Sequence, residues 1–196
     1  MKRLVQSELP SKWGSFKLIA YENSVETMPH LALVSGDKVG TEDATLVRVH
    51  SECMTGDVFG SHRCDCGEQL EISLQLIREK GGVLIYLRQE GRGIGLVNKL
   101  KAYNLQDEGL NTADANVHLG FEIDERDYKI ALDILADLNI SKIHLLTNNP
   151  QKIEAFEGSN IEVVSRIPLI VKPNNDNAEY LSAKRDIMGH LLKGTR

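Results

Sequence analysis

The three cysteines of this chain stand close together, and they restrict what it can fold into. They are Cys53, Cys64 and Cys66, and the rest of the 196 residues contain none. Thiolates are soft ligands that suit zinc, and a site with three protein ligands keeps an open position, as catalytic zinc sites do. The alternative is three unrelated buried thiols. We expect a fold that brings these sulfurs together around one catalytic zinc ion per chain.

The residues beside the cysteines indicate which kind of zinc site this is. One residue separates Cys64 from Cys66, whereas the paired ligands of zinc fingers are typically about two to four residues apart. His50 and Glu52 match the first half of the zinc deaminase signature, but its second half, Pro-Cys-x-x-Cys, is absent. If His50 were a fourth ligand, the zinc would be closed and structural. We favour three sulfur ligands, with His50 and Glu52 in the pocket.

Composition and charge narrow the class of protein. The chain is 41% hydrophobic and 26% charged, which is typical of a folded protein, and its length predicts one domain over residues 1–196. A net charge of -5 argues against sequence-independent nucleic-acid binding. No apolar run is long enough for a membrane span, and the N-terminus does not read as a signal peptide. We therefore expect a cytoplasmic protein without a nucleic-acid or membrane partner.

The pattern of apolar residues predicts an α/β fold. Short strand-like runs at 16–21, 30–34 and 45–50 predict a β-rich antiparallel N-terminal part, whose last strand delivers His50, Glu52 and Cys53 to one end. From Gly67 onward strands alternate with helices, which predicts parallel pairing with crossover helices. The expected strands are 83–87, 142–146 and 161–164, and the expected helices are 67–80, 94–108, 127–138, 151–156 and 178–193.

Two turns that follow predicted strands are candidate ligand sites. The glycine-rich stretch 88–95 exposes backbone N–H groups at a helix start, which favours anion binding, although a tight strand-to-helix connection gives the same pattern. In the stretch 147–152, Asn149 is a helix cap and Pro150 fits the first helical position. Thr147 and Lys152 would then face the crevice at the carboxyl ends of the strands, although plain capping also explains this stretch.

Two further features have both a structural and a functional interpretation. Asp124 and Arg126 precede a predicted helix, where acidic residues commonly offset the helix dipole. The functional alternative gives Asp124 proton transfer and Arg126 the stabilisation of charge. Tyr103 falls on the helix predicted at 94–108, where a tyrosine is usually half-buried packing.

Five stretches, taken in order along the chain, resemble GTP cyclohydrolase II. They are 48–53, 63–67, 88–92, 124–127 and 146–150. The resemblance covers nearly the whole chain and implies the α/β fold of that family. It implies hydrolysis of GTP to 2,5-diamino-6-(5-phosphoribosylamino)pyrimidin-4(3H)-one, formate and pyrophosphate, the first step of riboflavin biosynthesis. It also implies dependence on zinc, a requirement for magnesium at the GTP phosphates, and a homodimer.

The resemblance also assigns roles to individual residues. The zinc ligands fall on Cys53, Cys64 and Cys66, the proton acceptor on Asp124, the proposed nucleophile on Arg126, and a tyrosine that completes the reaction on Tyr103. The GTP contacts fall on Arg48, Val49, His50, Ser51, Glu52, Gln69, Glu90, Gly91, Arg92, Thr112, Thr147 and Lys152.

The chemistry of this reaction accounts for these residues. Water must attack C8 of guanine, a poor electrophile, and zinc lowers the pKa of bound water to about 7. Arg92, Lys152 and magnesium would hold the triphosphate in a protein that is acidic overall. An arginine side chain stays protonated and is a poor nucleophile. We therefore expect Arg126 to stabilise charge on the phosphoryl group while water attacks.

Two rival functions remain at this point. One is another zinc-dependent nucleotide hydrolase, such as a deaminase, which would release ammonia instead of formate and would not need the triphosphate. The other is a zinc-stapled module that binds a nucleotide or RNA, which would unfold when the zinc is removed.

Overall fold

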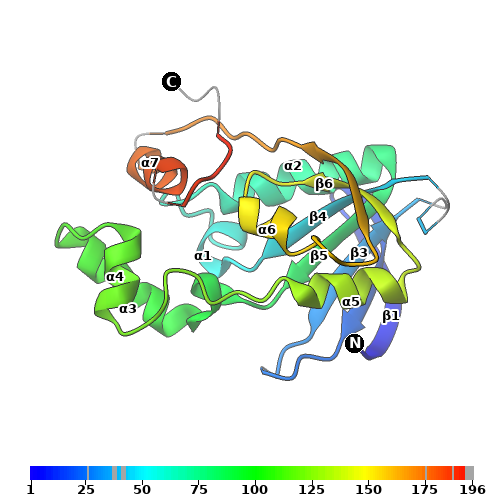
Figure 1. The fold of residues 1–196 in the computed structure, drawn as a ribbon, viewed down its shortest axis with the longest axis horizontal. Coiled ribbons are helices and arrows are strands. Elements are labelled where there is room, and N and C mark those ends of the chain that lie inside the picture. The colour runs from blue at the N-terminus through cyan, green and yellow to red at the C-terminus, as the bar shows by residue number, and fades with distance from the viewer. Residues whose placement is uncertain (26, 37–38, 41–42, 175, 187, 193–196) are drawn as a thin grey trace.

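A computed structural model describes the chain except residues 26, 37–38, 41–42, 175, 187 and 193–196 and the side chains of residues 112, 113 and 179. It contains one seven-stranded sheet of order β1-β2-β3-β5-β4-β6-β7 with helices on both faces (Figure 1). The strands are β1 (Arg3–Ser11), β2 (Gly14–Tyr21), β3 (His30–Ser35), β4 (Thr45–Ser51), β5 (Gly82–Leu87), β6 (Lys142–Leu146) and β7 (Glu162–Ile167).

The sheet has an antiparallel part and a parallel part. Strands β1, β2, β3 and β5 pair antiparallel, whereas β5, β4, β6 and β7 pair parallel. This arrangement confirms the predicted α/β class, but one detail of the prediction is wrong. Strand β4 is not part of the antiparallel pairing, because it lies between β5 and β6 and pairs parallel with both. Six of its seven residues are buried, as expected for a central strand covered on both faces.

Two helices cover the two faces of the sheet. Helix α2 (Cys66–Lys80) packs Leu74 and Ile77 on one face, in a core cluster that includes Leu84 of β5. Helix α5 (Lys129–Asp137) packs Ile134 and Leu135 on the other face, in a cluster that includes Ile85. Neighbouring residues of β5 therefore point to opposite faces, as strand geometry requires. The other helices are α1 (Met54–Asp57), α3 (Gly95–Asp107), α4 (Thr112–His118), α6 (Pro150–Glu154) and α7 (Ala178–Asp186), with a 3-10 turn at Glu90–Gly93.

Most predicted elements are confirmed, and the exceptions have physical reasons. Strand β1 was not predicted, since it is an edge strand with mostly exposed side chains. The last helix, predicted over 178–193, ends at Asp186 instead. Beyond it, Gly189 has a φ of 65°, a left-handed conformation that does not continue a helix. No helix in the described part of the chain has the length and apolar character needed to cross a membrane.

The parallel part of the sheet determines where a ligand can bind. Because β4, β5 and β6 run in the same direction, their carboxyl ends lie at one edge of the sheet. At the left of Figure 1, α1, α3 and α7 surround the end at which β4 and β5 stop. The crevice outside the carboxyl ends of the strands is the usual ligand site of open α/β sheets.

Candidate active site

A cavity lies at this edge and brings together most of the residues predicted from the sequence. Fifteen of the predicted residues line it: Arg48, His50, Ser51, Glu52, Cys53, Cys64, Cys66, Gln69, Glu90, Gly91, Arg92, Tyr103, Arg126, Thr147 and Lys152. Val49 does not line it, because its side chain is in the core on the α5 face of the sheet. Asp124 does not line it either, but its carboxylate forms an ion pair with Arg126, which does. Thr112 begins α4, but its side chain is outside the described part of the structure.

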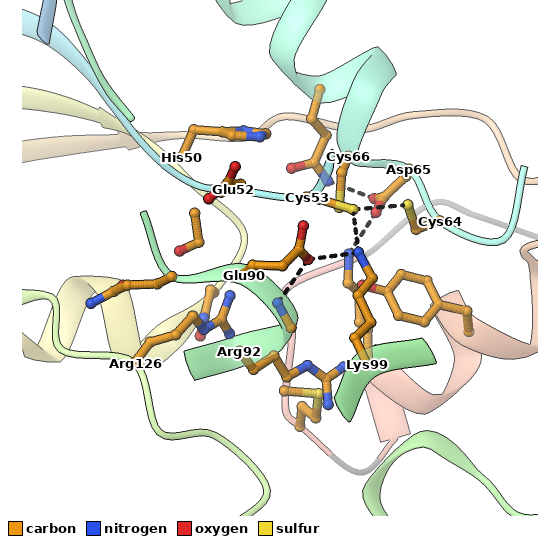
Figure 2. Close-up of a pocket in the computed structure, with 18 of the residues that line it drawn as sticks. His50, Glu52, Cys53, Cys64, Asp65, Cys66, Glu90, Arg92, Lys99 and Arg126 are labelled. Carbon is orange, nitrogen blue, oxygen red and sulfur yellow. Dashed lines mark hydrogen bonds and ion pairs between the residues drawn. The ribbon is translucent and has the colours of Figure 1, made fainter. Parts of the chain in front are cut away.

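The three cysteine sulfurs form a compact cluster (Figure 2). They lie within 4.8 Å of one another, and the Sγ atoms of Cys53 and Cys64 are 3.6 Å apart. Within the described residues, this is the one group of three or more side chains placed to hold a metal ion. Cys53 directly precedes α1 and Cys66 begins α2, so the cluster forms where the two helices meet. A soft, three-sulfur donor set of this size suits zinc.

Two glycines make this close approach possible. A Cβ atom at Gly56 would lie 2.9 Å from Sγ of Cys64 and 3.2 Å from Sγ of Cys53. A Cβ atom at Gly67 would lie 2.4 Å from the backbone oxygen of Gly56. Any larger residue at Gly56 would occupy the space beside the sulfurs. The backbone of α1 is therefore packed directly against the cluster, which fits a site shaped around a bound ion.

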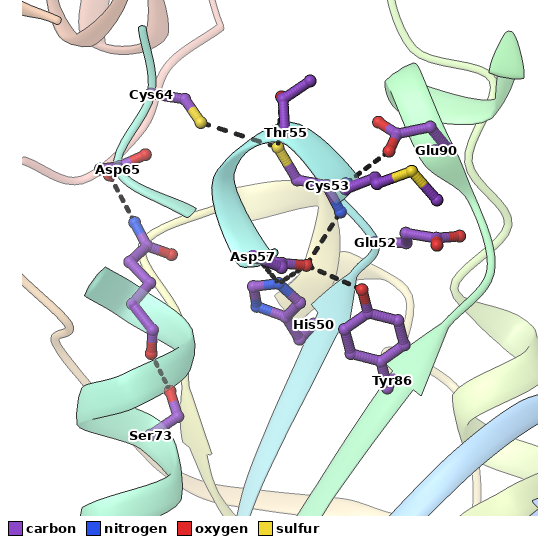
Figure 3. Close-up of polar contacts among 12 residues, drawn as sticks. His50, Glu52, Cys53, Thr55, Asp57, Cys64, Asp65, Ser73, Tyr86 and Glu90 are labelled. Carbon is purple, nitrogen blue, oxygen red and sulfur yellow. Dashed lines mark hydrogen bonds and ion pairs between the residues drawn. The ribbon is translucent and has the colours of Figure 1, made fainter. Parts of the chain in front are cut away.

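A buried carboxylate holds the turn that carries Cys53 (Figure 3). Asp57 accepts hydrogen bonds from the backbone N–H of Cys53 at 3.0 Å and from the Tyr86 hydroxyl at 2.8 Å. Its other contact is Nε2 of His50, at 3.0 Å. Burial lowers the pKa of His50, so its ring is neutral at pH 7. Among the described residues, His50 is not one of the side chains grouped with the sulfurs, so the geometry favours three sulfur ligands over a closed site with His50 as the fourth.

A second buried carboxylate faces the cluster from the glycine-rich turn. Glu90 accepts hydrogen bonds from the backbone N–H groups of Met54, at 2.6 Å, and of Gly91, at 2.8 Å. It also pairs with the ammonium of Lys99 at 2.8 Å. Gly91 and Arg92 both have positive φ values, 62° and 64°, which fold the turn back onto the cavity. The glycine-rich stretch is thus more than a connection, because it positions a carboxylate beside the sulfurs.

Two more polar side chains from the predicted set have defined partners. Glu52 forms an ion pair with Arg88 at 2.9 Å. The Tyr103 hydroxyl lies 3.3 Å from Oγ1 of Thr55, and the Arg63 guanidinium lies over its ring. Oγ1 of Thr55 is in turn 3.7 Å from Sγ of Cys53. Tyr103 therefore belongs to the wall of the cavity beside the cluster.

Several buried cations also line the cavity. Arg48 donates to the backbone oxygen of Leu146 at 3.0 Å and to Gln69 at 2.6 Å, and burial lowers its pKa to about 10. Lys152 donates to the backbone oxygen of Val49 at 2.7 Å. Burial, followed by repulsion from Arg48, lowers the pKa of Lys152 well below its ordinary value. Nε of Arg48 and Nη1 of Arg92 are buried, and neither has a hydrogen-bond partner among the described residues. In the view of Figure 2, Arg92 lies on the other side of Glu90 from the sulfurs.

Arg126 is tied to Asp124 by two side-chain hydrogen bonds. Burial disfavours charge on both groups, but their mutual contact lowers the pKa of Asp124. Burial alone would lower the pKa of Arg126, but its interactions with Tyr128 and with the Asp124 carboxylate outweigh burial and raise this pKa above the ordinary arginine value. Asp124 is therefore a carboxylate and Arg126 a guanidinium at neutral pH. This charge state supports a role for Arg126 in stabilising an anion.

Sequence reasoning missed several residues that complete the site. They are Asp57 and Lys99, beside the sulfurs, and a C-terminal group consisting of Tyr180, Lys184, Met188, His190 and Leu192. Lys184 reaches Asp65, between two of the cysteines, at 2.5 Å, and Leu191 donates to the backbone oxygen of Asn148 at 2.8 Å. None of these residues stands in a motif. Their spacing to Cys53 and Asp65 along the chain carries no helical or strand pattern that would have revealed the contacts.

Comparison with known proteins gives one family. A family model described as GTP cyclohydrolase II matches residues 2–168. "Riboflavin biosynthesis protein RibBA" of Chlorobium phaeovibrioides (strain DSM 265 / 1930) is 53% identical over 193 residues, which are 98% of this chain and 47% of that protein. The protein of the same name from Bacillus cereus (strain B4264) is 54% identical over 191 residues, which are 97% of this chain and 48% of that protein. This chain thus spans about half the length of these curated relatives.

A more distant match is found among solved structures. It is RibBX, described as a two-domain 3,4-dihydroxy-2-butanone 4-phosphate synthase from A. baumannii, with 24% identity over 87% of this chain and 40% of the other, and a TM-score of 0.47. The family assignment depends on the sequence match, which covers the β4 strand, all three cysteines, the glycine-rich turn and the turn after β6. This chain belongs to the GTP cyclohydrolase II family.

Proposed function

We propose that residues 1–196 form a single GTP cyclohydrolase II domain that hydrolyses GTP to 2,5-diamino-6-(5-phosphoribosylamino)pyrimidin-4(3H)-one, formate and pyrophosphate in riboflavin biosynthesis. One observation carries the proposal most directly. A three-sulfur cluster and a group of buried cations line the same cavity, at the carboxyl ends of β4, β5 and β6. A purine nucleoside triphosphate has an end that matches each: a ring carbon to be hydrolysed and a chain of phosphates.

The sulfur cluster would hold one zinc ion. Cys53, Cys64 and Cys66 would supply three ligands, and Nε2 of His50 is engaged by Asp57. When bound, zinc would act as a Lewis acid that makes water nucleophilic at neutral pH. Tyr103, whose hydroxyl lies 3.3 Å from Oγ1 of Thr55, would orient the attacking water or the formamide that precedes formate release. The same wall of the cavity serves both hydrolytic steps, since both take place at one carbon.

The cations would hold the phosphates. In the described part of the chain, Arg92 has a buried N–H without a partner, and Lys152 carries a cost of burial that a bound anion would offset. Magnesium with the phosphates would complete the neutralisation. The raised pKa of Arg126 supports our preference for a charge-stabilising role over attack on phosphorus. Trapping a guanylyl adduct on Arg126 would overturn that preference.

Several further properties remain predictions. We expect a homodimer, a cytoplasmic location and no nucleic-acid partner. The two rival functions differ from ours in what they release and in what zinc does. A deaminase would release ammonia, and a zinc-stapled module would bind a nucleotide without changing it.

The decisive experiment supplies the purified chain with GTP, zinc and magnesium and measures formate and pyrophosphate together. The proposal predicts that both are released and that a chelator stops release while the circular dichroism spectrum is kept. Ammonia without formate would establish the deaminase. Loss of the fold on chelation, with no product in the presence of zinc, would establish the structural zinc module.

A further inference from the structure

Lys99 is a buried cation that none of the predicted roles uses. It lies on α3, and its side chain is only 11% exposed. Its ammonium is 3.1 Å from Sγ of Cys53 and 2.8 Å from Oε1 of Glu90 (Figure 2). A buried ammonium is stable only when its N–H groups have partners. One of the partners of Lys99 is a sulfur of the three-cysteine cluster.

The pairing with Glu90 alone does not account for this position. Glu90 is already held by the backbone N–H groups of Met54 and Gly91, so Lys99 is not needed to fix it. A lysine that served only to neutralise Glu90 could leave its remaining N–H groups in the solvent. Instead, the side chain of Lys99 lines the cavity and directs a second N–H to Sγ of Cys53. A Cβ atom at Gly91 would lie 3.1 Å from Cβ of Lys99, so the turn packs closely against this side chain as well.

The contact between Lys99 and Cys53 would affect the charge of a metal ion site formed by the three sulfurs. Three thiolates and a divalent ion together carry one net negative charge, and the Lys99 ammonium offsets it. A charge-assisted N–H···S bond also withdraws electron density from the thiolate. The thiolate then donates less to the metal, and the metal stays a stronger Lewis acid. Groups outside the ligand shell commonly tune a bound metal in this way.

We propose that Lys99 is a positioning residue of the metal site, which hydrogen-bonds the Cys53 thiolate and offsets the net negative charge of a metal ion held by the three sulfurs. The proposal rests on the proposed function, because the metal is the one that would serve ring opening. It adds to that function a residue that holds no metal and is not among the predicted GTP contacts.

The test uses cobalt(II) in place of zinc, on the full chain and without GTP. Cobalt bound to thiolates shows a sulfur-to-metal charge-transfer band, whose energy reports how strongly the sulfurs donate. Removal of the hydrogen bond in Lys99→Met is expected to shift this band to lower energy, whereas Lys99→Arg, which keeps a charged donor, retains the wild-type position. Lys101→Met is the matched control, because Lys101 is an exposed lysine of the same helix. An unshifted band in Lys99→Met with stoichiometric cobalt would overturn the proposal.

A second variant and a second readout protect the test. If Lys99→Met does not fold or does not bind cobalt, Lys99→Gln, which keeps a donor without the charge, is expected to show a smaller shift in the same direction, and no shift would refute the role. With zinc and GTP, Lys99→Met is expected to lower kcat for formate release about 10–100-fold with KM for GTP unchanged. A shifted cobalt band in a protein that makes no formate would refute the proposed function and leave the role of Lys99 standing. Normal formate release with an unshifted band would refute the role of Lys99 and leave the proposed function standing.

Discussion

The two ends of the cavity differ in how fully their charged side chains are paired within the protein. At the sulfur end, around Cys53, each of the buried carboxylates Asp57 and Glu90 has three partners. At the cationic end, which contains Arg92 and Lys152, Arg92 has a buried N–H that no described residue pairs with, and burial lowers the pKa of Lys152. Satisfied polar networks are rigid, whereas unpaired buried donors cost free energy. The sulfur end is thus organised in advance, and the cationic end needs an anion to complete it.

The largest effect is expected from breaking the sulfur end itself. Cys53→Ser removes one of three soft ligands, so we expect formate release to be abolished. Because Asp57 and Glu90 still hold the surrounding backbone, the circular dichroism spectrum should be unchanged. Unfolding of this variant would mean that the metal is structural and that the hydrogen bonds of Asp57 and Glu90 cannot hold the backbone of this region without it.

A methyl group at Gly56 tests whether the space beside the sulfurs is needed. The added Cβ would lie 2.9 Å from Sγ of Cys64, so Gly56→Ala should spread the cluster and weaken zinc binding by about 10–100-fold, as other changes around metal ligands do. A competition assay with a chromogenic chelator measures this affinity.

Gly60→Ala is the control for this change. A Cβ atom there meets nothing within 4 Å, although the φ of 64° makes the substitution strained. It should lower thermal stability and leave zinc affinity unchanged. Equal zinc affinity in Gly56→Ala and the wild type would show that the cluster has room to spare.

At the cationic end, removal of a charged side chain is expected to stabilise the protein without ligand. Lys152→Met removes a buried ammonium whose charge is disfavoured, so we expect the Tm of the protein without ligand to rise. The same change removes a charge-assisted bond to phosphate, worth about 1.5–3 kcal/mol, so KM for GTP should rise about tenfold or more. Lys142→Met, at an exposed position of β6, should change neither quantity. A lower Tm in Lys152→Met would mean that the protein alone satisfies this lysine.

The smallest expected effect concerns the C-terminal residues that line the cavity. Burial, together with nearby cations such as Lys184, lowers the pKa of His190 from 6.5 to about 4. Because its folded-state pKa is depressed, His190 contributes stability that is fully present above pH 6.5 and is lost as the pH falls toward 4. The Tm of His190→Gln should therefore fall less than that of the wild type over this range. Parallel Tm curves for the two proteins would contradict the burial of His190.

The sequence predicted the parts of the site that lie in continuous motifs. The three cysteines, the glycine-rich turn and the turn after β6 all line the cavity. Cys53 and the two turns each follow a strand that could be recognised from its apolar run, and Cys64 and Cys66 could be grouped with Cys53 because the chain has no other cysteines. The contacts that connect these parts could not be predicted. Lys99 reaches Cys53 across 46 positions, and Lys184 reaches Asp65 across 119. Such contacts depend on how the helices pack, which local periodicity does not encode.

The fold shows the same limit. Dense apolar runs predict where the strands lie, but they do not predict which strands pair with each other. The run at 45–50 has the same local pattern whether it pairs antiparallel or parallel, and only the insertion of β4 between β5 and β6 decides. The edge strand β1 has little apolar burial to reveal it.

X-ray absorption of the zinc-loaded chain tests most directly whether the sulfur end holds an open metal site. We predict three sulfur atoms at about 2.3 Å and one lighter atom that GTP or its product can replace. A zinc ion with four protein ligands, including a nitrogen of His50, or a purified chain that binds no zinc at all, would contradict it.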